Sequence, residues 1–126
     1  MHKSKLAGFI IDCETDDLDA AAAFWSAALG LKAGRTDDPD DEGYARLHDH
    51  QNDLHIEVQK VAHPSRVHID IETDDIEAEV VRLEKLGARR IGKIKRWWVM
   101  EAPTGQRFCV VRKSSPQFET KATQWK

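Results

Sequence analysis

The residues of this chain that can do chemistry gather on short segments where polar and apolar side chains alternate. His68 and Asp70 alternate with isoleucines on one segment, and Glu57 stands between two apolar residues on another. Such alternation predicts strands with one packed face and one polar face. Carboxylates that crowd together raise one another's pKa and supply both a proton donor and a proton acceptor, as general acid–base catalysis requires. The competing interpretation is that most of them pair with Arg46 or Arg107 across the sheet.

Cysteine, tryptophan and histidine side chains offer further candidates. Cys109 would be a nucleophile if a base or cation lowered the pKa of its thiol, and no motif places such a group beside it, so packing is the simpler interpretation. Trp97 and Trp98 are adjacent on an expected strand, so one should pack in the core and the other offer a flat apolar wall to a ligand. His68 is either a pocket residue or a hydrogen-bonded structural residue. The remaining histidines in loops or at strand ends are expected in solvent, namely His2, His48, His50 and His63.

An internal repeat indicates which elements hold these residues. The segment 12–20 aligns without gaps on 70–78, and about two thirds of the aligned positions are identical. Each copy has a short strand, an acidic helix start and an apolar stripe at helical spacing. The first helix is expected to begin after Asp16 or Asp17 and to end at Gly30. The second is expected over about 75–86, with Thr73 or Asp74 as its N-cap.

Three strand-like stretches follow each helix, separated by turn signals. They cover about 31–36, 43–48 and 54–61 in the first half, and 89–95, 97–101 and 107–112 in the second. The fold class is therefore α+β, with the order βαβββ occurring twice. We expect one domain over residues 1–113, made of units at about 7–61 and 66–112, and a C-terminal tail over 114–126.

Three segments carry a family resemblance. They are Ala-Phe-Trp-Ser-Ala-Ala-Leu-Gly at 23–30, Val-His-Ile-Asp-Ile at 67–71 and Ala-Pro-Thr-Gly-Gln-Arg-Phe-Cys at 102–109. Over about residues 6–112 the chain resembles the vicinal oxygen chelate superfamily of glyoxalases, bleomycin-resistance proteins and extradiol dioxygenases, and most of all its glyoxalase-like branch. The resemblance implies tandem βαβββ units whose curved eight-stranded sheet surrounds a cavity, often with a divalent metal held by the first and last strands of both units.

Only half of the metal-ligand positions implied by the resemblance hold a residue of the type that the family uses there. Ile10 occupies the first position and cannot bind a metal, and Cys109 stands where the metalloenzymes carry glutamate, whereas Glu57 and His68 match. A Zn, Ni or Fe site normally has at least three protein ligands, so no metal cofactor is expected. The alternative is a rebuilt site of Asp12, Glu57 and His68, because strand alternation puts Asp12 on the same face as Ile10.

These observations favour a glyoxalase-like protein that binds a small organic molecule in the sheet-lined cavity. Catalytic residues cannot be assigned from the sequence, and whether the protein is an enzyme stays open. One alternative is a metal-dependent lyase, isomerase or dioxygenase. Another is a non-catalytic sequestering protein of the antibiotic-resistance type. The expected ligand-binding residues are Asp12, Glu57, His68, Cys109 and Trp97.

Composition and sequence pattern further narrow the expected partners and cellular location of the protein. A net charge of −3 with scattered basic residues makes nucleic acid a poor partner. The early apolar run at 6–11 is too short for a signal peptide or a membrane span, and two cysteines are too few for a disulfide framework, so a cytoplasmic protein with reduced thiols is expected. The tail from Ser114 should be disordered or pack on a partner. Its residues Phe118 and Trp125, together with the resemblance, favour a homodimer.

Overall fold

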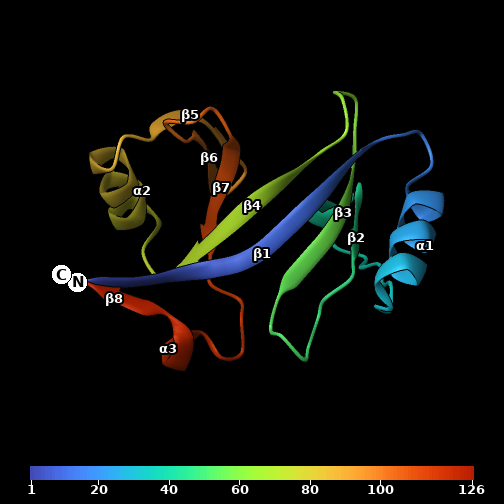
Figure 1. Cartoon of the computed structure of the whole chain (residues 1–126), viewed down its shortest axis with the longest axis horizontal. Helices are drawn as coiled ribbons and strands as arrows, with labels where there is room; N and C mark the ends of the chain where they lie inside the picture. The colour runs from blue at the N-terminus through green and yellow to red at the C-terminus, as the bar shows by residue number, and fades with distance from the viewer. The chain divides into compact units, whose positions relative to one another are not determined.

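The computed structural model describes all 126 residues and contains three α helices and eight strands (Figure 1). A single 3-10 turn, Pro39–Asp41, lies between the first helix and the second strand. In chain order the elements are β1 (His2–Glu14), α1 (Leu18–Leu29), β2 (Tyr44–Arg46), β3 (His55–Val61), β4 (Arg66–Thr73), α2 (Ile76–Lys85), β5 (Arg89–Ile94), β6 (Trp97–Glu101), β7 (Arg107–Arg112), α3 (Phe118–Lys121) and β8 (Thr123–Trp125).

The fold is α+β with an eight-stranded mixed sheet, as the repeat and the resemblance predicted. The hydrogen-bonded strand order is β2-β3-β1-β4-β7-β6-β5, and β8 pairs with β1. β4 and β7 run parallel, whereas the pairs β2–β3, β5–β6 and β6–β7 are antiparallel. The chain divides into two compact units, residues 9–67 and residues 1–8 with 68–126, which are described separately below.

In the unit of residues 9–67, α1 packs its apolar face on β1, β2 and β3. Asp17 is the N-cap and accepts a hydrogen bond from the Ala20 amide at 3.0 Å, and Gly30 ends the helix with φ 69°. Both helix ends agree with the sequence prediction. The core between helix and strands consists of Ile11, Leu18, Ala22, Ala45, Leu47, Ile56 and Val58.

In the other unit, α2 packs on β6 and β7 through Val80, Leu83, Met100 and Val110. Its N-cap is Asp75, so the prediction of Thr73 or Asp74 was wrong. Both residues are engaged elsewhere because β1 lies beside them.

The backbone of Lys3 in β1 accounts for this difference. The Thr73 hydroxyl donates to the Lys3 carbonyl at 2.8 Å, and the Asp74 carboxylate accepts from the Lys3 amide at 2.8 Å. With these two side chains bonded to β1, Asp75 is left to accept from the Ala78 amide at 3.1 Å.

The strand predictions hold best in the second half, where β5, β6 and β7 match the expected ranges to within a residue. In the first half, the expected strand at 31–36 is reduced to one bridge between Gly34 and Arg46, and the strand at 43–48 shortens to the three residues of β2. The eighth strand is β8, which comes from the tail.

The tail is ordered on its own chain, so the expectation that it is disordered or docks on a neighbour was wrong. Phe118 is only 2% exposed, and β8 pairs with the first residues of β1. The Ser115 amide donates to the buried carboxylate of Glu72 at 3.1 Å, and the Trp125 indole donates to the Ser4 hydroxyl at 2.8 Å. Phe118 is therefore buried in its own chain, and the partly buried Trp125 is hydrogen-bonded to β1. None of the helices combines the length and the apolar character needed to cross a membrane.

Candidate functional site

The sheet of residues 1–8 and 68–126 has one face under α2 and one face turned away from it. Asp70 of β4 is paired with Cys109 of β7, and Cys109 is paired with Val99 of β6. Alternation along each strand then puts His68, Asp70, Cys109 and Trp97 on the face away from α2. The side chains that pack toward the helix include Ile71, Trp98, Met100, Phe108 and Val110. One tryptophan thus lies on each side, as expected.

Burial along β4 is the reverse of what its alternation predicts. Ile69 is 51% exposed, whereas the His68 and Asp70 side chains are only 12% and 11% exposed. The reason is the extent of α2, whose core cluster reaches Ile71 but not Ile69. The assignment of faces was therefore right, and the expectation that Ile69 is buried was wrong.

His68, Asp70 and Cys109 form a cluster on this face. One ligand atom from each residue lies within 4.8 Å of the other two, and His68 Nε2 stands 3.6 Å from an Asp70 carboxylate oxygen. Cys109 is 9% exposed. Thiolate, imidazole and carboxylate are donor types that Zn²⁺ accepts, and the same three groups can also move a proton. The cluster is the densest set of chemically capable side chains in this unit.

No local motif in the sequence put a base beside Cys109, although the family resemblance implied His68 and Cys109 at two positions of one site. The sequence offered no base beside this thiol, but the parallel pairing of β4 with β7 brings His68 close to it. These residues are about 40 positions apart, so no local motif could show the contact. The signal that could have found it is the pairing of the two strands that carry them.

In the unit of residues 9–67, Asp12 is held by a basic side chain. Its carboxylate accepts from the Arg66 guanidinium at 3.3 Å, the His63 ring stands 4.0 Å away, and the side chain is 1% exposed. Ile10, two residues earlier on the same strand, is 3% exposed and cannot ligate a metal. Asp12 is therefore a paired, buried carboxylate.

Glu57 of β3 contacts the His55 ring and is also well shielded, with 14% of its side chain exposed. It is opposite Arg46 in the β2–β3 ladder, yet the Arg46 guanidinium stands 3.8 Å from Asp41. In the other unit Arg107 binds Glu101 at 3.1 Å. The two arginines expected to neutralise the strand carboxylates thus have other acidic partners.

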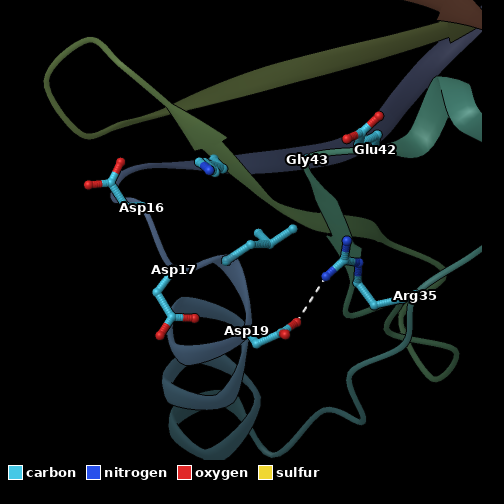
Figure 2. Close-up of a pocket in the computed structure, with 8 residues that line it drawn as sticks. Asp16, Asp17, Asp19, Arg35, Glu42 and Gly43 are labelled. Carbon is cyan, nitrogen blue, oxygen red and sulfur yellow. Dashed lines mark hydrogen bonds and ion pairs between the residues drawn. The ribbon is translucent and has the colours of Figure 1, made fainter.

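A surface hollow of about 340 Å³ lies at the start of α1, and none of the residues expected to bind a ligand lines it (Figure 2). Its Asp17 is the helix cap, and its Asp19 forms a 2.9 Å ion pair with Arg35. The structural roles of these residues account for the hollow, and no function is assigned to it. It is lined by Asp16, Asp17, Leu18, Asp19, Arg35, Glu42, Gly43 and Lys60.

Of the histidines expected in solvent, His50 and His63 are exposed, whereas His2 and His48 are not. The His2 side chain is 9% exposed and bonds Glu79 at 2.7 Å. His48 lies against His50 and His55, with ring centroids 4.5 Å and 6.0 Å away. Burial lowers the pKa of His48, and its two histidine neighbours lower it further.

A model of the glyoxalase-like domain matches residues 8–111 of the chain. The chain belongs to the glyoxalase-like family. This places it in the vicinal oxygen chelate superfamily, as the sequence resemblance implied. No curated protein sequence matches the glyoxalase-like chain.

Solved structures agree with this membership. The chain is similar to methylmalonyl-CoA epimerase from Mycobacterium tuberculosis, with 17% identity, a TM-score of 0.63 and coverage of 86% of this chain and 88% of the epimerase. It is also similar to 2,2′,3-trihydroxybiphenyl 1,2-dioxygenase from Sphingomonas wittichii, with 16% identity, a TM-score of 0.58 and coverage of 90% and 42%. At these identities the similarity shows the fold of the glyoxalase-like chain and no more.

Proposed function

We propose that this glyoxalase-like protein binds a small organic molecule on the sheet face that carries His68, Asp70 and Cys109. The observation that supports the proposal is the convergence of these three side chains within 4.8 Å on a face that α2 does not cover. Trp97 shares the face and would supply a flat apolar wall. The proposed ligand contacts in this unit are His68, Cys109 and Trp97.

Asp12 and Glu57 are proposed as further ligand contacts, in the unit of residues 9–67. Ile11 and Cys13 pack toward α1, so alternation along β1 puts Asp12 on the opposite face. The Arg66 partner keeps a positive charge beside the Asp12 carboxylate. A ligand here would meet polar, paired side chains and would itself need hydrogen-bonding groups.

If the protein is an enzyme, proton transfer is the chemistry that its residues support. His68 would take a proton from a bound ligand, and Asp70, 3.6 Å from the imidazole, would stabilise the imidazolium that forms. Such a step suits a lyase or an isomerase. Binding without turnover would instead support a sequestering protein of the antibiotic-resistance type.

The test is a binding and turnover assay on the full chain with two compounds suggested by the structurally similar enzymes, methylmalonyl-CoA and 2,2′,3-trihydroxybiphenyl. Binding is followed by calorimetry and by NMR signals of the imidazole rings. A positive result is saturable binding that shifts His68 and weakens about tenfold or more in His68→Gln and Trp97→Leu, as expected for loss of about 1.4 kcal/mol. His63→Gln is the matched control. Binding that does not shift His68 and is unchanged in both variants would contradict this site.

A second candidate is a metal-dependent lyase, isomerase or dioxygenase, and it is favoured by the same cluster. His68, Asp70 and Cys109 provide imidazole, carboxylate and thiolate donors, which fit Zn²⁺ by donor type. This set is better supported than Asp12, Glu57 and His68, because Asp12 already binds Arg66. A bound divalent ion would polarise an oxygen of the ligand.

Elemental analysis of protein purified without chelator, followed by Co²⁺ exchange, tests this candidate. A near-stoichiometric metal with thiolate-to-cobalt absorption that disappears in Cys109→Ser would support it. Cys13→Ser is the matched control for the other thiol. Protein without metal that also fails to bind added Zn²⁺ through His68 would leave the metal-free binding function as the better proposal.

We also propose a homodimer in the cytoplasm. The tail no longer supports association of two chains, because Phe118 is buried in its own chain. The support comes instead from two apolar residues of β4, Ile69 and Val67, whose surfaces are 51% and 60% exposed. Neither cysteine is in a disulfide bond, which suits a reducing compartment. Light scattering should give twice the 14.3 kDa chain mass. A mass that stays at one chain at high concentration, in the wild type and in Ile69→Lys alike, would overturn the dimer.

A further inference from the structure

The β2–β3 ladder ends in a turn that gathers three of the six histidines of the chain. The ladder register, continued to the bridge between Asp49 and Leu54, makes His48 and His55 direct cross-strand neighbours. Opposed residues of an antiparallel ladder have their Cβ atoms about 4.5–5.5 Å apart. His50, the first residue after Asp49, adds a third ring from the turn.

The rings are already packed together. The His48 centroid is 4.5 Å from that of His50 and 6.0 Å from that of His55, with interplanar angles of 52° and 67°. A metal bound at about 2.0–2.1 Å to one nitrogen of each ring would hold neighbouring centroids roughly 4.5–5.5 Å apart. The His48–His50 separation falls in this range and the His48–His55 separation is slightly larger, so rotations of the side chains would be needed to bring the three rings to one ion.

Two of these rings have a carboxylate near their Nε2 atom. Glu57 contacts Nε2 of His55, and Asp53 lies 4.0 Å from Nε2 of His48. Asp53 is 6% exposed and is held at φ 53°, in the left-handed region. When Glu57 accepts the Nε2 proton of His55, the lone pair of that ring is on Nδ1 and the ring is oriented, as in most metal-binding histidines. Asp53, at 4.0 Å, is beyond hydrogen-bond distance of His48 and would support that ring only after the ring rotates toward it.

Two hydrogen bonds stabilise the turn that carries His50. Asn52 donates to the Asp49 carboxylate through its backbone at 3.2 Å and through its side chain at 2.7 Å. A turn held by these hydrogen bonds, with acidic side chains beside the imidazoles, suits a divalent cation.

We propose that His48, His50 and His55 form a transition-metal site of the Zn²⁺, Ni²⁺ or Cu²⁺ type at the end of the β2–β3 ladder. Imidazole is a preferred ligand of all three ions. The site belongs to the unit of residues 9–67 and shares no residue with the cluster of His68, Asp70 and Cys109, although Glu57, proposed above as a ligand contact, also supports the His55 ring.

The experiment is a Zn²⁺ titration of the chelator-treated full chain, followed by two-dimensional NMR of the imidazole nitrogens. His48, His50 and His55 should shift together and saturate at one equivalent per site, while His63 stays unchanged. The His68 signals report separately on the other cluster. Failure of one site is thereby distinguished from failure of the other.

Variants test the ligand set. His48→Gln and His55→Gln should abolish the joint shift of the remaining two rings, and His63→Gln should leave it intact. Asp53→Asn, which tolerates the same backbone conformation, should weaken Zn²⁺ binding about 10- to 100-fold, as loss of a supporting carboxylate does. Amide spectra show whether each variant is folded. The proposal is overturned if Zn²⁺ leaves the three rings unshifted in the folded wild type, or if binding persists unchanged in folded His48→Gln and His55→Gln.

Discussion

Cys109 of β7 is paired directly with Asp70 of β4 in a parallel ladder, and His68 completes the cluster two residues before Asp70. The cluster therefore depends on a pairing between the two strands that begin and end the second βαβββ unit. A change in the register of that pairing by one residue would move Cys109 to the face under α2.

The first prediction compares the two thiols. Burial raises the pKa of Cys13, with Asp12 adding to the effect, so this thiol stays protonated at neutral pH. Cys109 has His68 as a neighbouring base. After metal removal, iodoacetamide should therefore modify Cys109 faster than Cys13, and His68→Gln should slow Cys109 at least severalfold. Peptide mass spectrometry measures both rates, and faster labelling of Cys13 would contradict the role given to His68.

The second prediction concerns the two faces of the sheet in this unit. In the single chain, measured at a concentration too low for association, Ile69→Ala should lower the free energy of unfolding by no more than about 1 kcal/mol, because the side chain is half exposed there. Met100→Ala should cost about 2–5 kcal/mol, since Met100 is 0% exposed in the core under α2. Urea denaturation followed by circular dichroism gives both values. Equal costs would mean that Ile69 is buried in solution.

The third prediction tests the tail. Phe118→Ala should destabilise the protein by about 3–5 kcal/mol, because its side chain is 2% exposed among residues of its own chain. Phe24 in α1 is 62% exposed and is the matched control, with an expected cost below about 1 kcal/mol. Thermal and urea unfolding of the two variants measure the contrast. A tail that makes no stabilising contact would give the same small loss for both.

The fourth prediction is a pH dependence carried by Glu79. Burial opposes its charge, but hydrogen bonds from Arg82 and His2 outweigh burial and lower its pKa below the ordinary value of a glutamate. A carboxylate whose pKa is lowered by folding stabilises the protein above its unfolded pKa and loses that contribution as pH falls through the folded value.

Stability should therefore decline as pH falls below about 4.5, the value of the unfolded carboxyl. Glu79→Gln should cost about 1–3 kcal/mol at pH 7 and should show a shallower acid decline. Urea unfolding at pH 7, 5 and 3.5 measures both effects. Parallel pH curves for the variant and the wild type would show that Glu79 does not carry the decline.

The amino-acid sequence by itself determined the order and type of most elements. The repeat of 12–20 at 70–78, the helix stop at Gly30 and the strand-like stretch at 107–112 are local patterns, and the structure confirms the elements that they predicted. Local patterns also separated the two faces of β4 and placed one tryptophan on each side of β6, because alternation depends only on the backbone of a strand.

Tertiary structure alone decided which face is buried, which groups meet and where the tail goes. Ile69 is exposed because α2 reaches only Ile71, and Asp75 caps α2 because β1 engages Thr73 and Asp74. His68 meets Cys109 only through the β4–β7 pairing. Each of these contacts joins residues far apart in the chain, and their free energy depends on packing that no window of neighbouring residues contains.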